Sequence, residues 1–104
     1  MTTAPELVRH EWAEGYRRLE AERADRTRCR VLHEQVDAVT EQLRRRLGTV
    51  FTIAELVAEY RRAEPWAREA LAELPAAAQW VPGLTTATDA AFHLYARRAL
   101  DYAP

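Results

Sequence analysis

Residues 29–57 read CRVLHEQVDAVTEQLRRRLGTVFTIAELV and contain the end of one predicted helix and the start of the next. Spacings of three and four residues alternate along a seam of small and aliphatic side chains, formed by Cys29, Leu32, Val36, Val39 and Leu43. The arginines Arg44–Arg46 then precede Gly48, which is typical of a helix C-terminus because cations suit its negative end. Thr52 and Glu55 have the spacing of a capping box, which predicts that a second helix begins there.

The chain upstream of this seam is also compatible with helix. Thr3 and Pro5 form a start signal, with a capping hydroxyl followed by a proline where no amide is required. A second apolar stripe, one residue out of phase with the seam, is formed by Trp12, Tyr16 and Leu19. Because acidic and basic residues alternate between the two sets, we predict one continuous helix over residues 4–47, about 65 Å long. The alternative is a break near residue 25, where Asp25 or Thr27 can cap a new helix.

The C-terminal half is predicted to contain three shorter helices. Pro65 ends or kinks the first of them and fits the first turn of the second, and Pro75 stops the second. The connection that follows is expected to be anchored in the core by Trp80 and Val81. The last helix is expected to begin near Thr85 or Thr86. It is expected to be the most buried element, because its apolar residues cover more than half of its circumference.

The composition agrees with an all-α fold. The 104 residues include 20 Ala and 11 Leu but only one Ile and three Gly, which favours helix over strand at almost every position. We therefore predict a single helical domain over residues 1–104. It comprises a long amphipathic, coiled-coil-like helix over residues 4–47, broken or unbroken near residue 25, and a helical C-terminal subdomain over residues 52–103. The three shorter helices of this subdomain pack against the long helix as a small bundle.

Net charge and amino-acid composition restrict the cellular location and the partners that we expect for this protein. Fifteen arginines oppose sixteen acidic residues, and the resulting net charge of −1 provides no global attraction for nucleic acid or anionic lipid. No apolar leader occurs in the first thirty residues, and the longest uncharged run, over residues 74–88, is interrupted by prolines. We expect a soluble cytoplasmic protein without a membrane partner. The chain lacks Lys and Asn, whose codons are A-rich, which predicts a bacterial source with a GC-rich genome.

The predicted long helix implies self-association. Each short helix spans on the order of 15–25 Å and covers only part of it, so the N-terminal stripe would be an exposed apolar patch in a monomer. We therefore predict a homodimer whose interaction residues are Trp12, Tyr16, Leu19, Leu32, Val36, Val39 and Leu43. The leading functional hypothesis is a small protein–protein interaction or regulatory module that pairs through this helix. If the chain instead breaks and folds back, the N-terminal stripe would pack on the protein's own core.

Groups that could carry chemistry are sparse. Three side chains lie along one side of a helix at the spacing of a thiolate with its base: Cys29, His33 and Asp37. The favoured interpretation of this set is a small hydrophobe in the seam with a polar flank. His10, Glu14 and His93 lack the Glu-x-x-His spacing of metal sites in helical bundles. We predict no catalytic residue, no metal and no cofactor, and an enzyme is the less favoured interpretation.

Two further functional classes remain open. Between Arg17 and Arg30, six arginines face three acidic residues and could contact a nucleic-acid backbone, as in a transcriptional regulator. The interleaved acids favour a solvated helix instead, so nucleic acid is a disfavoured partner. Aromatic residues gather in the second half of the chain and could line a pocket for a small molecule or substrate: Tyr60, Trp66, Trp80, Tyr95 and Tyr102. The more common role of such residues is the core of a small domain.

Overall fold

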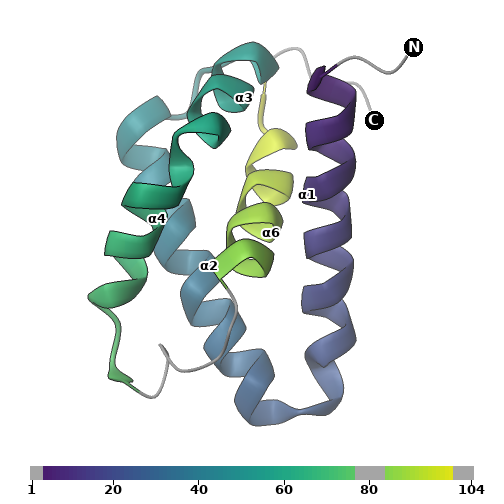
Figure 1. Cartoon of the computed structure of the whole chain (residues 1–104), viewed down its shortest axis with the longest axis vertical. Coiled ribbons are helices and arrows are strands. Elements are labelled where there is room, and N and C mark those ends of the chain that lie inside the picture. The colour runs from purple at the N-terminus through teal and green to yellow at the C-terminus, as the bar shows by residue number, and fades with distance from the viewer. Residues whose placement is uncertain (1–3, 77–83, 100–104) are drawn as a thin grey trace.

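A computed structural model describes residues 4–76 and 84–99 (Figure 1). Its elements are α1 (Ala4–Ala21), the 3-10 turn η1 (Glu22–Ala24), α2 (Arg26–Leu47), α3 (Ile53–Arg61), α4 (Ala63–Ala72) and α6 (Leu84–Ala96). No strand occurs in this part of the chain, and the helices pack as a compact bundle. The predicted all-α fold, with a long N-terminal helical region and shorter helices packed on it, is confirmed.

The N-terminal helical region is broken at Asp25. The Asp25 backbone is extended, with φ −107° and ψ 104°, and its side chain accepts a hydrogen bond from the Arg28 amide at 3.0 Å. The predicted continuous helix over residues 4–47 is therefore wrong, and the alternative of a break near residue 25 is confirmed. The longest dimension of the molecule is only 38 Å, so a straight helix of about 65 Å would not fit within it. Folding back is favoured because it buries both apolar stripes against one core.

Helix α6 is the centre of the bundle. Figure 1 shows it lying between α1 and α2, and it contacts both of these helices as well as α3 and α4. Its side chains at Ala87, Ala90, Ala91, Phe92, Tyr95 and Ala96 are all buried. The prediction that the last helix is the most buried element is confirmed. The many alanines of α6 allow its backbone to approach its neighbours closely.

Short sequence motifs predict several helix ends that the structure confirms. Gly48 follows α2 with a φ of 71°, in the left-handed region that favours glycine, and its carbonyl oxygen accepts a hydrogen bond from the Tyr95 hydroxyl at 2.8 Å. Thr52 and Glu55 form the predicted capping box at the start of α3. Pro65 lies in the first turn of α4, where its missing amide leaves no bond unmade.

Other parts of the prediction lie beyond the described residues. The start signal at Thr3 and the anchors Trp80 and Val81 fall there. The last helix begins at Leu84, one residue before the earlier of the two predicted starts, Thr85 and Thr86.

Both predicted interaction stripes lie inside the bundle. Six of the seven residues assigned to intermolecular pairing are buried: Trp12, Leu19, Leu32, Val36, Val39 and Leu43. Tyr16 is partly buried and packs against the same core. The expectation that Trp12, Tyr16 and Leu19 form an exposed patch is wrong, because α6 and the chain reversal at Asp25 cover them within a single chain. The structural reason given for a second copy therefore does not apply.

Candidate functional site

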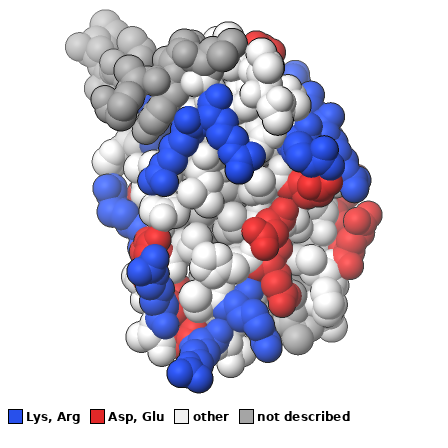
Figure 2. Space-filling model, turned by 180° about the vertical axis from the view of Figure 1, so that it is seen from behind, with Lys and Arg blue, Asp and Glu red and all other residues white. Residues whose placement is uncertain are grey.

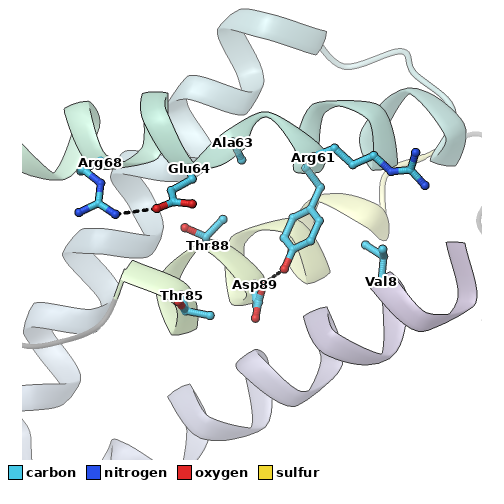
Figure 3. A pocket seen from close by; sticks show the side chains of 9 residues that line it. Val8, Arg61, Ala63, Glu64, Arg68, Thr85, Thr88 and Asp89 are labelled. Atoms are coloured by element: carbon cyan, nitrogen blue, oxygen red, sulfur yellow. Dashed lines mark hydrogen bonds and ion pairs between the residues drawn. The ribbon is translucent and has the colours of Figure 1, made fainter. Parts of the chain in front are cut away.

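A pocket of about 450 Å³ opens where four helices meet (Figure 3). Helix α1 contributes Val8, α3 contributes Tyr60 and Arg61, α4 contributes Ala63, Glu64 and Arg68, and α6 contributes Thr85, Thr88 and Asp89. This volume falls in the range of pockets that hold small organic molecules, roughly 300–1,000 Å³. Two of the nine lining residues, Val8 and Ala63, are apolar, and Tyr60 adds an aromatic ring to six polar or charged side chains.

Tyr60 of α3 connects that helix with α1 and α6 beside the pocket. Its hydroxyl lies 2.5 Å from a carboxylate oxygen of Asp89 on α6 and 3.3 Å from a carboxylate oxygen of Glu11 on α1. A phenol has one proton to donate, so only one of the two carboxylates receives it at a time. The shorter distance indicates that Asp89 is the main acceptor.

Burial changes the proton affinity of this pair. Asp89 is 8% exposed, and the loss of solvent raises its pKa to about 6, against an opposing contribution from the Tyr60 hydrogen bond. The nearby charge of Glu11 also raises the pKa of Asp89, and Arg18 lowers it. Burial and the Asp89 carboxylate raise the pKa of Tyr60 above its ordinary value. At neutral pH the pair is therefore a neutral phenol and a largely ionised carboxylate.

Thr88 supplies a buried hydroxyl that has no hydrogen-bond partner among the described residues. The residue is 7% exposed, and its hydroxyl oxygen has no hydrogen bond within the described part of the chain. It lines the pocket next to Asp89, between that residue and Glu64 (Figure 3). An unpaired buried hydroxyl costs about 1–3 kcal/mol, which is why such groups are rare in folded proteins.

The two arginines that line the pocket differ in their ion pairs. Arg68 is held by Glu64 one turn earlier in α4, with an N–O distance of 2.7 Å. Arg61 extends away from Asp89 in Figure 3, and its side chain is exposed. No ion pair formed among the described residues includes Asp89. The buried carboxylate therefore has a neutral hydroxyl as its donor, and no arginine of the described chain forms an ion pair with it.

An aromatic cluster fixes the position of Tyr60. Its ring meets Phe92 edge to face at a centroid distance of 5.0 Å and Trp12 at 5.6 Å. Trp12 in turn lies 5.4 Å from Phe92. Contacts of this kind restrict the ring beyond what its buried area alone would do. The phenol hydroxyl is therefore held in place by the aromatic core.

The other sets considered from the sequence do not form a site. Cys29 is half-buried, whereas His33 and Asp37 are exposed on α2. His10 is exposed, and Glu14 pairs with Arg17 at 2.6 Å. Within residues 4–76 and 84–99, no group of three or more His, Cys, Asp or Glu side chains is arranged to hold a metal ion.

His93 packs against neighbouring side chains and belongs to no group of metal ligands among the described residues. Its ring stacks on Tyr16 at a centroid distance of 4.9 Å, and its Nε2 lies 3.2 Å from an Arg97 nitrogen. Burial, together with the neighbouring Arg97 charge, lowers its pKa.

Ion pairs neutralise part of the positive charge in the arginine-rich stretch from Arg17 to Arg30. Three of its six arginines pair with acidic residues nearby in the chain: Arg17 with Glu14, Arg23 with Glu20, and Arg28 with Glu22. On the face shown in Figure 2, basic side chains lie next to acidic ones at several places, with uncharged surface between them. This distribution is typical of a solvated helical surface and adds no support for a nucleic-acid footprint.

The five aromatic residues that the sequence suggests for a pocket lie in different places. Tyr60 lines the pocket, whereas Trp66 and Tyr95 are buried in the core, and Trp80 and Tyr102 lie outside the described residues. Sequence reasoning missed Thr88 and Asp89 as site residues. The available signal was a pair of adjacent polar residues within the alanine-rich, otherwise apolar stretch of α6.

The described helices include none that is both long enough and apolar enough to cross a membrane. The chain matches no protein-family model, and no curated protein or solved structure matches it. The fold and the site thus define an all-α bundle with a partly polar interhelical pocket.

Proposed function

We propose that this protein is a small helical module that binds a small polar molecule in the pocket between α1, α3, α4 and α6. The observation that carries the proposal is the Thr88 hydroxyl, which is buried, lines the pocket and has no partner among the described residues. The Thr88 oxygen is itself fully buried, so a ligand reaches it once the side chain rotates toward the pocket, and the hydrogen bond then formed would recover the free energy that burial costs the hydroxyl. The prearranged Tyr60 and Asp89 beside it supply the further polar contacts that fix a ligand's orientation.

This proposal replaces helix pairing as the leading function. The hypothesis of a self-associating interaction module depended on an exposed stripe at Trp12, Tyr16 and Leu19, and those residues pack in the core. Homodimer formation, a protein partner and nucleic-acid association all stay predictions, without support from an exposed apolar stripe or an uninterrupted basic surface. A regulatory role is compatible with ligand binding, since a bound ligand stabilises the folded state that it occupies.

The test is a fragment screen by two-dimensional amide NMR on the full chain and on two variants. Thr88→Val keeps the side-chain volume but removes the hydroxyl, and Thr86→Val is the matched control on the same helix, outside the pocket lining. We expect fragments to shift amides of α3, α4 and α6 around the pocket. Thr88→Val should weaken that binding by about tenfold, the worth of one good hydrogen bond, and Thr86→Val should leave it unchanged.

A second readout comes from stability without any ligand. Because Thr88→Val removes an unpaired buried polar group, it should raise the free energy of unfolding by about 1 kcal/mol, whereas Thr86→Val should not. Fragments that bind anywhere but this pocket, or that ignore Thr88→Val, would overturn the proposal.

A further inference from the structure

We infer that the ligand of this pocket is a small organic ammonium ion with a short apolar body, its nitrogen bound between the Asp89 carboxylate and the Thr88 hydroxyl. The inference rests on the proposed function and specifies the chemistry of the ligand.

Charge balance favours a cation. Asp89 and Glu11 both approach the Tyr60 hydroxyl, whose single proton serves one carboxylate at a time. Asp89 is buried and takes part in no ion pair of the described chain, so its negative charge is only partly compensated. A cationic ligand would complete that compensation, whereas an anionic ligand would meet a like charge in a poorly solvated place.

The acceptor atoms suit an ammonium group. An ammonium nitrogen carries three N–H donors and no acceptor. Thr88 and Asp89 are consecutive residues of α6 that both line the pocket, and the Thr88 hydroxyl has no hydrogen-bond partner among the described residues. Its oxygen is fully buried, so the Thr88 side chain has to rotate toward the pocket before it accepts a hydrogen bond from the ammonium group. A neutral alcohol could bond the same atoms but would bring no compensating charge. The charge-assisted bonds of an ammonium ion are roughly twice as strong as neutral ones.

The arginines of the pocket do not compete for this role. Glu64 already binds Arg68 at 2.7 Å, and Arg61 extends away from Asp89 in Figure 3. The remaining walls include Val8, half-buried against the core, and the buried Ala63. A short hydrocarbon attached to the ammonium group would pack against these side chains.

The experiment compares three probes that share one hydrocarbon skeleton: isoamylamine, isoamyl alcohol and isovalerate. Each is titrated into the full chain and followed by amide NMR at about pH 7.5, where Asp89 with a pKa of about 6 is ionised. We expect the amine to bind at the pocket about tenfold more tightly than the alcohol, and isovalerate to give no saturable shift there.

Two variants assign the preference to Asp89. Asp89→Asn should reduce amine binding by about tenfold and bring it to the level of the alcohol, because the amide keeps an acceptor but loses the charge. Asp37→Asn, an exposed carboxyl on α2, is the matched control and should change nothing. If Asp89→Asn fails to fold, the unmodified chain answers the question through pH. Amine binding should weaken as the pH falls through about 6, where the Asp89 carboxylate becomes protonated.

The groups that face Asp89 in this titration are Tyr60 of α3 and both Glu11 and Arg18 of α1. Glu64 and Arg68 of α4 line the same pocket and pair with each other. Glu11→Gln therefore separates the contribution of the second carboxylate. A pH dependence that persists in Glu11→Gln supports Asp89 as the anchor, and one that disappears would contradict it.

The outcomes separate this inference from the proposed function. Equal or tighter binding of the alcohol or of isovalerate at the pocket would overturn the ammonium inference and leave the proposed function standing. Binding of the amine that survives Asp89→Asn would do the same. If none of the three probes and no member of the fragment set shifts the pocket amides, both the inference and the proposed function fail.

Discussion

A Cβ atom placed on Gly15 would lie 2.4 Å from the Cβ atom of Asp89, closer than real side chains come. Helices α1 and α6 therefore meet at a point where only a hydrogen fits on α1. The contact places the Asp89 backbone directly against α1, on the helix that also carries Glu11. A glycine inside a helix usually costs about 1 kcal/mol relative to alanine, and here the close approach of two helices explains its presence.

Gly15→Ala should accordingly destabilise the protein, against the helix propensity of alanine. We expect the free energy of unfolding to fall by about 2 kcal/mol, because the new methyl group forces α1 and α6 apart. Urea denaturation measures the change. The control is Ala58→Gly at an exposed position of α3, where propensity alone should cost about 1 kcal/mol. A Gly15→Ala variant more stable than the unmodified chain would show that the two helices do not pack this closely.

The buried carboxyl of Asp89 predicts a dependence of stability on pH. Its folded-state pKa of about 6 lies above the ordinary value of 3.8, so the folded protein binds the proton more tightly than the unfolded chain does. Stability from this group is therefore greatest at low pH and declines as the pH rises from about 4 to about 6, by at most roughly 3 kcal/mol. Asp89→Asn cannot ionise and should lack this decline.

Chemical denaturation at about pH 4.5 and about pH 7.5 checks the sign. The difference in unfolding free energy between Asp89→Asn and the unmodified chain should shift in favour of the variant at the higher pH. Asp37→Asn, exposed on α2, should show no such shift. A variant that loses stability equally at both pH values would mean that Asp89 is not ionised at a cost in the folded state.

Glu59 is a second buried carboxyl, but unlike Asp89 it is paired with arginines. Its carboxylate lies 3.0 Å from both Arg46 and Arg62, and the Arg46 guanidinium also stacks over Trp66 at 4.9 Å. Arg46→Ala should therefore reduce the unfolding free energy by about 1–2 kcal/mol, through the lost ion pair and the lost cation–π contact. Arg62→Ala, whose arginine side chain is 67% exposed, is the matched comparison and should cost under about 1 kcal/mol. Equal costs, measured by thermal unfolding, would contradict the unequal environments of the two arginines.

Substitution of the N-terminal stripe distinguishes packing from association. Replacing Trp12, Tyr16 and Leu19 together by glutamine should unfold the whole domain, because these side chains pack in the core that α6 completes. Far-UV circular dichroism should show a loss of helix well beyond α1. The matched control replaces the exposed Arg17 and Arg18 by glutamine and should leave the helix content unchanged.

The sequence-based dimer hypothesis predicts the opposite result for the triple variant, namely dissociation with the C-terminal helices intact. Sedimentation equilibrium of the unmodified chain complements this test. A mass of 11.9 kDa corresponds to a monomer, and twice that value would support the predicted homodimer. If the triple variant retained folded C-terminal helices, the stripe would have no essential role in the intramolecular core.

The sequence by itself determined the helical class and most of the helix ends. Gly48 after α2, the Thr52–Glu55 capping box and Pro65 in the first turn of α4 each act through backbone groups within a few residues, so their effect can be read locally. The apolar faces were also correctly placed, since the residues of both stripes pack in the core. Tyr60 was anticipated as one of several aromatic residues that could line a pocket.

Only the tertiary structure decided what covers those faces and where the pocket lies. The stretch from Glu20 to Arg28 can be helical or can turn, and the choice at Asp25 depends on the burial gained when α1 folds back beside α6. The pocket depends on the same choice, because Tyr60 and Thr88 come from helices separated in the chain. The contact of Gly15 with Asp89 joins residues 74 positions apart, which no local pattern encodes. Long-range packing, set by the fit of whole helix surfaces, places these groups together.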